Sequence, residues 1–131
     1  MPGTKRLSRY ARIHSKSRIL LVLDARSQLW GFPGGTPEER EGGEQTLYRE
    51  LCEEVGPVSG LSAVFYHTET RGEKIIEYWK VRCSVRVHIR EIDREVVSAK
   101  FYSLAALKAL PLCHVAPGVT AMASDVLEFG H

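Results

Sequence analysis

The sequence lacks the long apolar run that a membrane-spanning helix requires. Its longest aliphatic stretch covers only residues 19–23, whereas such a helix takes about 20 apolar residues. A large charge of one sign is also missing, because 18 Lys and Arg residues are nearly balanced by 16 Asp and Glu residues. This balance does not indicate a strongly basic protein that binds nucleic acid or a membrane surface. We therefore expect no membrane partner.

Cysteine and histidine are scarce and scattered. The three cysteines (Cys52, Cys83 and Cys113) lie far apart and form no C-x-x-C pair, which argues against a disulfide framework or a zinc site. The five histidines show neither H-x₃-H nor H-E-x-x-H spacing. An odd number of widely spaced cysteines is typical of a reducing compartment, so we predict a cytoplasmic protein.

The length of 131 residues and a hydrophobic content of 44% predict one globular domain that covers residues 1–131. Its charge is unevenly distributed, because six basic residues and no acid precede Asp24, so that residues 1–18 carry +6. A mitochondrial transit peptide has this composition. The alternation in residues 7–14, followed by the apolar residues 19–23, instead favours two β-strands with solvated ends.

The hydrophobic pattern predicts a mixture of strands and helices, an α/β or α+β sandwich. Residues 30–35 contain Pro33 and two glycines, so we expect an irregular loop there. Residues 75–87 alternate so regularly that one face should be buried, with Glu77 as its exception, and the face of Tyr78 should be wet. Strands are expected at residues 7–14, 18–24, 61–68, 75–87 and 100–102, and helices at 44–55, 104–110 and 119–129.

Three glutamates on the helix at residues 44–55 are the main candidates for chemistry. Glu50, Glu53 and Glu54 have helical i, i+3 and i+4 spacing, which places them on one face, and we expect that face to lie opposite Leu47 and Leu51. Carboxylates this close repel one another unless a cation neutralises them. Oxygen ligands suit a hard cation such as Mg²⁺ or Mn²⁺. The plainer alternative is a solvated acidic helix face.

The residues around these glutamates have a specific spacing. In order, the fixed positions are Gly35, Glu41, Arg49, Glu50, Leu51, Glu53, Glu54 and Gly56. This spacing resembles the Nudix box of the Nudix hydrolase family, G-x5-E-x7-R-E-U-x-E-E-x-G-U with U aliphatic, over Gly35 to Pro57. Eight of nine positions match, and Pro57 replaces the last aliphatic residue. Residues 30–35 are similar to the W-x-x-P-G-G approach of the family.

The resemblance implies an α/β/α sandwich around a central mixed β-sheet and Mg²⁺-dependent hydrolysis of a pyrophosphate bond, with Mn²⁺ as a possible substitute. It implies a nucleoside diphosphate linked to another group as substrate. The metal ligands that it implies are Glu50, Glu53, Glu54 and the Gly34 carbonyl, and the structural residues of the box are Gly35, Glu41 and Gly56.

The remaining catalytic assignments also follow from the resemblance. Arg49 should pair with Glu41, because we expect it to point to a different face from Glu53. The general base is either Glu50 or Glu95, since Glu95 precedes an aromatic-containing strand as a catalytic-loop glutamate does in relatives.

The substrate is expected by elimination. Relatives that hydrolyse ADP-ribose or dinucleoside polyphosphates have a Pro or a Tyr about fifteen or seventeen residues after the box, where this chain has Gly72 and Lys74. This favours a nucleoside triphosphate, cleaved to monophosphate and pyrophosphate, with Arg12, Phe32 and Tyr78 as substrate-binding residues. Alternatives are dinucleoside polyphosphates, the 5′ end of RNA, ADP-ribose, or a domain that only senses nucleotides. A homodimer is also possible.

Overall fold

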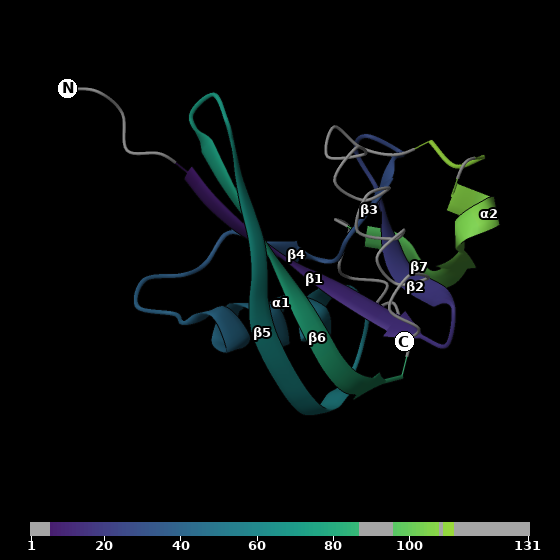
Figure 1. The fold of residues 1–131 in the computed structure, drawn as a ribbon, viewed down its shortest axis with the longest axis horizontal. Coiled ribbons are helices and arrows are strands. Elements are labelled where there is room, and N and C mark those ends of the chain that lie inside the picture. The colour runs from purple at the N-terminus through teal and green to yellow at the C-terminus, as the bar shows by residue number, and fades with distance from the viewer. Residues whose placement is uncertain (1–5, 87–95, 108, 112–131) are drawn as a thin grey trace.

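The computed structural model describes residues 6–86, 96–107 and 109–111. Seven strands and two helices follow one another along these residues (Figure 1). Their order is β1 (Arg6–Ser15), β2 (Arg18–Asp24), β3 (Trp30–Gly31), β4 (Gly34–Gly35), α1 (Gly43–Glu54), β5 (Val58–Arg71), β6 (Lys74–Val85), β7 (Val96–Ser103) and α2 (Leu104–Leu107).

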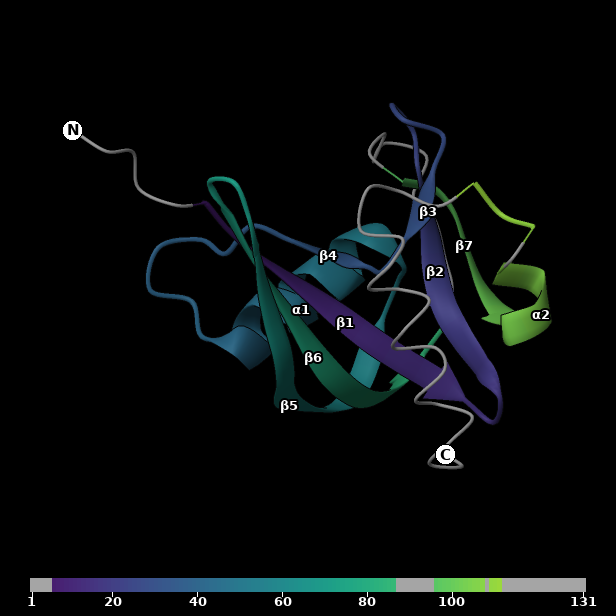
Figure 2. The same ribbon diagram turned by 45° about the horizontal axis from the view of Figure 1, so that its top comes forward.

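The strands form one mixed sheet, as the sequence predicts. Its main path runs β3-β2-β1-β6-β5, while β4 pairs with β1 and β7 pairs with β2. Strands β1 and β6 run parallel, and the other pairs in the described part of the chain are antiparallel. The long strand β1 therefore connects the β5–β6 hairpin to the β2–β7 pair (Figure 2).

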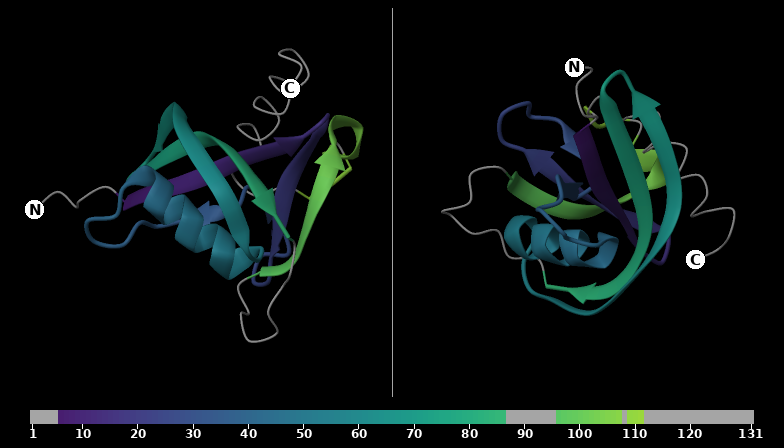
Figure 3. Two further views of the ribbon diagram at one scale, coloured as in Figure 1. Left: turned by 90° about the horizontal axis from the view of Figure 1, so that it is seen from below. Right: turned by 90° about the vertical axis from the view of Figure 1, so that its left-hand side faces the viewer.

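Both faces of strand β2 are buried, which explains its continuous apolar run. Ile19 and Leu21 belong to one hydrophobic cluster, with Trp30 on β3. Leu20 and Val22 belong to a second cluster, which contains residues of α1 such as Leu47 and Leu51. Helix α1 lies across the face of the sheet that the second cluster lines (Figure 3). A second helical layer would need residues 119–129, which lie outside the described residues.

Strand β6 does not have the single wet face that its alternation predicts. Ile76 and Tyr78 are 1% and 0% exposed, because the first cluster covers this half of the strand. Only the far end of the same face, at Arg82 and Ser84, is exposed. The prediction was wrong for the first half of the strand because a two-residue alternation gives the faces and not what covers each of them.

Other differences concern the ends of elements. Residues 30–35 contain the short strands β3 and β4 instead of only an irregular loop. Strands β5 and β7 are longer than predicted and α2 is shorter, while α1 begins and ends one residue before the prediction. Within the described residues, neither helix has the length and hydropathy to cross a membrane.

Candidate active site

Helix α1 places its three glutamates in different surroundings. Glu50 and Glu54 are buried, at 8% and 9% exposure, whereas the side chain of Glu53 is 51% exposed. Glu54 follows Leu47 by seven residues, or nearly two helical turns, so both project from almost the same face. The expectation that the glutamates lie opposite the apolar stripe was therefore wrong.

Two glycines allow these carboxylates to approach the sheet. The Gly34 amide donates a hydrogen bond of 2.8 Å to Glu54 Oε1. Gly34 has a φ of 148°, and a Cβ there would collide with the backbone of Arg9. A Cβ on Gly35 would lie 2.6 Å from Glu50 Oε1. The backbone thus requires glycine at Gly34, whereas Gly35 leaves the space that the Glu50 carboxylate occupies.

Arg49 connects the box loop to two of the glutamates. Its Nε lies 2.7 Å from Glu41 Oε2 and its Nη2 lies 3.0 Å from Glu41 Oε1, which confirms the predicted pair. Its Nη1 lies 3.0 Å from Glu50 Oε1 and 3.4 Å from Glu53 Oε2. Arg49 and Glu53 are four residues apart and share a helix face, so the expectation of different faces was wrong.

These contacts shift the titration of both partners. The hydrogen bonds from Arg49 lower the pKa of Glu41 to about 2, and the Glu38 backbone amide contributes to the same shift. The Glu41 carboxylate in turn raises the pKa of Arg49 above its ordinary value. Both groups are therefore charged at neutral pH, and the loop before α1 is fixed to the middle of the helix.

A second polar network fixes the start of α1 to the sheet. Arg9 on β1 donates to Glu77 Oε1 at 2.8 Å and to Thr46 Oγ1 at 3.1 Å. The indole of Trp79 also donates to Glu77 Oε1, at 3.0 Å. Glu77, the single acid on the apolar face of β6, is thus stabilised there by two hydrogen-bond donors, Arg9 and Trp79. Because Arg9 is held in this network, it does not face an open phosphate site.

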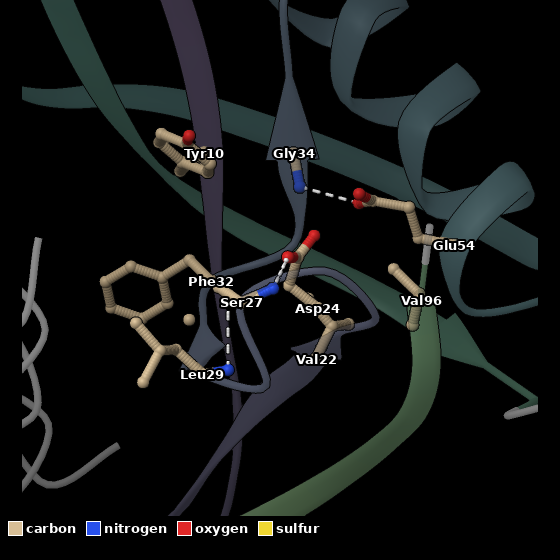
Figure 4. A pocket seen from close by; sticks show the side chains of 10 residues that line it. Tyr10, Val22, Asp24, Ser27, Leu29, Phe32, Gly34, Glu54 and Val96 are labelled. Carbon is tan, nitrogen blue, oxygen red and sulfur yellow. Dashed lines mark hydrogen bonds between the residues drawn. The ribbon is translucent and has the colours of Figure 1, made fainter. Parts of the chain in front are cut away.

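A cavity of about 320 Å³ lies beside Glu54 (Figure 4). Its apolar wall includes Tyr10, Phe32 and Val96, and its polar wall includes the carboxylates of Asp24 and Glu54. The full lining is Tyr10, Val22, Asp24, Ser27, Leu29, Gly31, Phe32, Gly34, Glu54 and Val96. A concave site with apolar walls and a few polar groups is typical of small-molecule binding.

Of the three predicted substrate-binding residues, only Phe32 reaches this cavity. Tyr78 is fully buried, its hydroxyl donates to Glu69 Oε1 at 2.7 Å, and burial raises its pKa. Arg12 is 3% exposed, and its guanidinium lies 4.9 Å from the centre of the Tyr66 ring. The assignments of Tyr78 and Arg12 are corrected accordingly, because both side chains are packed within the fold.

The donors of the box suit a hard divalent cation. Glu50 and Glu53 already share one positive group, the Nη1 of Arg49, and their oxygens are ligands of the class that Mg²⁺ and Mn²⁺ prefer. In the part of the chain that the structure describes, no three His, Cys, Asp or Glu residues are gathered closely enough to form a metal centre. Glu54 faces Gly34 instead of joining the other two. Glu95 lies outside the described residues.

Most of the lining residues of the cavity were not predicted from the sequence, among them the polar residues Tyr10 and Asp24. Tyr10 belongs to an alternating strand, and it shares one face of that strand with polar and basic residues. The sequence pattern therefore did not distinguish it from solvent-exposed positions. Asp24 is the first acid of the chain and ends the apolar run of β2. A lone carboxylate at a strand end was the available signal, although only the packing of β2 against β3 places it in a cavity.

Comparison with known proteins identifies the family. A family model described as the NUDIX domain matches residues 5–122. No curated protein matches the chain. Among solved structures, one of MutT from work on Aliivibrio salmonicida and Vibrio cholerae is similar, with a TM-score of 0.74 and 20% identity over 90% of this chain and 95% of that chain.

Two further structures share the fold. An ADP-ribose pyrophosphatase from Streptococcus suis has a TM-score of 0.67 and 20% identity, over 98% of this chain and 96% of that chain. The NUDIX domain of Shewanella oneidensis NrtR in complex with ADP ribose has a TM-score of 0.64 and 24% identity, over 95% of this chain and 90% of that chain. The family match supports the prediction of a pyrophosphohydrolase enzyme. Members of this family generally use divalent metal ions. The chain belongs to the Nudix family.

Proposed function

We propose that the protein is a Mg²⁺-dependent pyrophosphohydrolase that converts a nucleoside triphosphate to a monophosphate and pyrophosphate. The observation that carries this proposal is the position of Glu54. It belongs to the Nudix box, accepts a hydrogen bond from Gly34 and lines the cavity. A nucleotide in the cavity would therefore have its phosphates next to the box carboxylates.

Glu50, Glu53 and Glu54, with the Gly34 carbonyl, would hold the divalent cation. When bound, Mg²⁺ or Mn²⁺ neutralises phosphate charge and lowers the pKa of a coordinated water. The protein itself positions these donors. Glu50 and Glu54 are held against β4 by the close approach of the helix at the two glycines of that strand.

Arg49 acts as a positioning residue in this proposal. Glu41 holds the guanidinium of Arg49 with two hydrogen bonds, which keeps its positive charge beside Glu50 and Glu53. Arg49 itself is not one of the residues that line the cavity. Glu50 or Glu95 would accept the proton of the attacking water. Glu95 directly precedes Val96, which lines the cavity.

The cavity would hold the nucleobase. Phe32 and Tyr10 provide aromatic surface, and aromatic rings contact bases through stacked or edge arrangements. No lysine or arginine lines this cavity among the described residues, so the charged phosphates should lie outside it, toward the metal ligands.

ADP-ribose is the main alternative substrate. It is supported by the Streptococcus suis enzyme and by the NrtR domain that binds ADP ribose. Dinucleoside polyphosphates and RNA 5′ ends are less well supported, because Arg9 is paired with Glu77 and Arg12 is packed on Tyr66. Arg82 and Arg86 on the exposed side remain available for extra phosphates.

The test is a substrate panel with Mg²⁺ or Mn²⁺ in which the nucleotide products are separated and quantified by chromatography, alongside released pyrophosphate. Hydrolysis of ADP-ribose to AMP and ribose 5-phosphate releases no pyrophosphate, so its products must be measured directly. We expect monophosphate and pyrophosphate from a nucleoside triphosphate, at a higher kcat/KM than for ADP-ribose, dinucleoside tetraphosphate or triphosphorylated RNA. Glu53→Gln should abolish this activity, while Glu39→Gln, at an exposed position of the box loop, should retain it. Faster hydrolysis of ADP-ribose would replace the proposed substrate, and nucleotide binding without any hydrolysis would indicate a sensor.

A further inference from the structure

The cavity beside Glu54 has an unusual polar wall for a site that would receive part of a polyanion. Its two carboxylates are those of Asp24 and Glu54, and it has no lysine, arginine or histidine among the lining residues that the structure describes. Glu54 belongs to the box, and the proposed function uses it. Asp24 lies outside the box, and no step of the proposed reaction requires it.

Asp24 is held firmly at the end of β2. Its Oδ2 accepts a hydrogen bond of 2.8 Å from the Ser27 amide. Its own amide donates to the Leu29 carbonyl at 3.0 Å, and its carbonyl accepts from the Gln28 amide at 2.9 Å. Three hydrogen bonds therefore fix both the backbone and the carboxylate of Asp24, so that the side chain has a defined direction.

Figure 4 shows where this carboxylate points. One oxygen faces the Ser27 amide, and the other is directed across the cavity toward Gly34 and Glu54. Val96 and Glu54 lie beyond this second oxygen and belong to the same cavity lining. A ligand in the cavity that approaches Val96 and Glu54 would thus present one of its edges to the carboxylate of Asp24.

A carboxylate accepts hydrogen bonds and donates none when it is ionised. It is satisfied by an N–H edge, and it is opposed by a carbonyl oxygen at the same place, because two acceptors then meet without a proton between them. A site built to pair with one polar group discriminates strongly against an analogue that lacks it. The polar wall of the cavity should therefore bind bases that present an N–H donor more tightly than bases that present a carbonyl oxygen at the same edge.

We propose that Asp24 is a specificity-determining residue, which accepts a hydrogen bond from the amino group of the base and so selects amino-bearing bases over bases with only carbonyl oxygens at that edge. This inference rests on the proposed function, since it assumes that the cavity receives the base of a nucleotide. It adds the chemical class of the base and the residue that recognises it.

Matched substrate pairs test the inference. The members of dGTP/dITP differ by the 2-amino group, and those of dCTP/dUTP differ by an amino group in place of a carbonyl. In the pair that the enzyme hydrolyses faster, kcat/KM should favour the amino-bearing member by about 10- to 100-fold, the range of a hydrogen bond to a charged group.

Asp24→Asn is the informative variant. Asn can accept from the Ser27 amide as Asp does, because both residues support this type of turn, so the fold should be kept. Its amide offers a donor as well as an acceptor, and the ratio within the pair should fall to about 1 or reverse. Glu39→Gln removes a charge from an exposed position of the box loop and should leave the ratio unchanged.

Equal kcat/KM values within both pairs, or a preference that survives in Asp24→Asn, would overturn the role of Asp24. A complete absence of nucleotide hydrolysis would instead count against the proposed function. In that case calorimetric titration with dGMP and dIMP still decides the inference. Tighter binding of dGMP that is lost in Asp24→Asn supports it, and equal affinities contradict it.

Discussion

The Nudix box and the cavity beside it are built from different kinds of sequence. The box is one continuous segment, Gly35 to Pro57, and its main ion pair joins residues only eight positions apart, Glu41 and Arg49. The cavity is lined by residues of β1, β2, β3, β4, α1 and β7 and of the segments that connect β2 to β4. Glu54 is the residue that belongs to both.

The two regions also differ in the kind of contact that holds their charged groups. Arg49 has ionic contacts within 4 Å with the four carboxylates of Glu38, Glu41, Glu50 and Glu53. Asp24, in the cavity, is fixed by the hydrogen bonds of a turn and has no ion pair among the described contacts. Under the two proposals the box carries out the chemical step and the cavity selects the substrate, and the variants below separate these two roles.

The largest loss of activity among the variants that separate the box from the cavity is expected for a substitution of Gly35. In Gly35→Ala the new Cβ would lie 2.6 Å from Glu50 Oε1, so the flexible carboxylate must move while the backbone can remain in place. A displacement of this size should lower kcat by about 100-fold. Steady-state kinetics, with circular dichroism to verify folding, measures it.

Gly42→Ala is the matched control for that variant. A Cβ at Gly42 would meet only Gln45 Oε1, at 3.6 Å, which is an ordinary contact. Its kcat should stay close to that of the wild type. An equal loss of activity in both variants would mean that the glycines before α1 are generally intolerant of alanine and that the contact of Gly35 with Glu50 is not the cause.

Arg49→Lys is expected to have the next largest effect. Lysine keeps the positive charge but cannot make the two-point pair with Glu41, so Glu50 and Glu53 lose their shared, oriented partner. Loss of such a supporting group costs about 10- to 100-fold in metal affinity or activity. Titration with Mn²⁺ followed by its paramagnetic signal gives the affinity, and kinetics gives kcat.

Arg82→Lys, on the exposed end of β6, controls for a general effect of replacing arginine. If Arg49→Lys binds Mn²⁺ as tightly as the wild type and turns over equally fast, the positioning role of Arg49 is wrong.

A substitution in the cavity should change KM, whereas the substitutions in the box should change kcat. Phe32→Leu keeps an apolar core residue but removes aromatic surface from the lining of the cavity. We expect KM to rise by about 2- to 10-fold, the range of a single aromatic contact, while kcat stays close to the wild-type value. A loss confined to kcat would place Phe32 with the box instead of the cavity and would remove the distinction between the two regions.

The smallest effect concerns the pH dependence of stability. Because Arg49 lowers the pKa of Glu41 from 4.5 to about 2, the Glu41 carboxylate stabilises the folded protein above pH 4.5, and this stabilisation is lost as the pH falls toward 2. Glu41→Gln should therefore have a lower Tm than the wild type at neutral pH, and the difference should shrink between these two values. A difference that is independent of pH would exclude the ion pair as its source.

The parts predicted from the sequence are those that depend on local spacing. Residues 44–55 predicted α1 within one residue at each end, because its apolar residues recur at helical spacing. The contact of Arg49 with Glu41 was also predicted and is present, although the reason given for it, a face different from that of Glu53, was wrong. The strand pattern of β1 and β2 was equally local.

The parts that escaped prediction depend on which strands meet. Tyr78 looked exposed because the alternation of β6 gives two faces and does not tell which of them is covered. The ring of Phe32, from the segment between β3 and β4, covers it with its centroid 6.0 Å away. Asp24 on β2 and Tyr10 on β1 line one cavity because β2 pairs with both β1 and β3. Such contacts between distant segments are set by the whole fold.

The central claim is that the negative charge of Glu54 is needed for hydrolysis, whereas its side chain as a hydrogen-bond acceptor for Gly34 is enough to maintain the cavity. Glu54→Gln tests it directly, because glutamine can still accept the hydrogen bond from Gly34. The measurement is pyrophosphate release from a nucleoside triphosphate with Mg²⁺, alongside the affinity for the monophosphate product. We predict that release falls by at least about 100-fold while monophosphate affinity stays close to that of the wild type. Undiminished release would contradict the account.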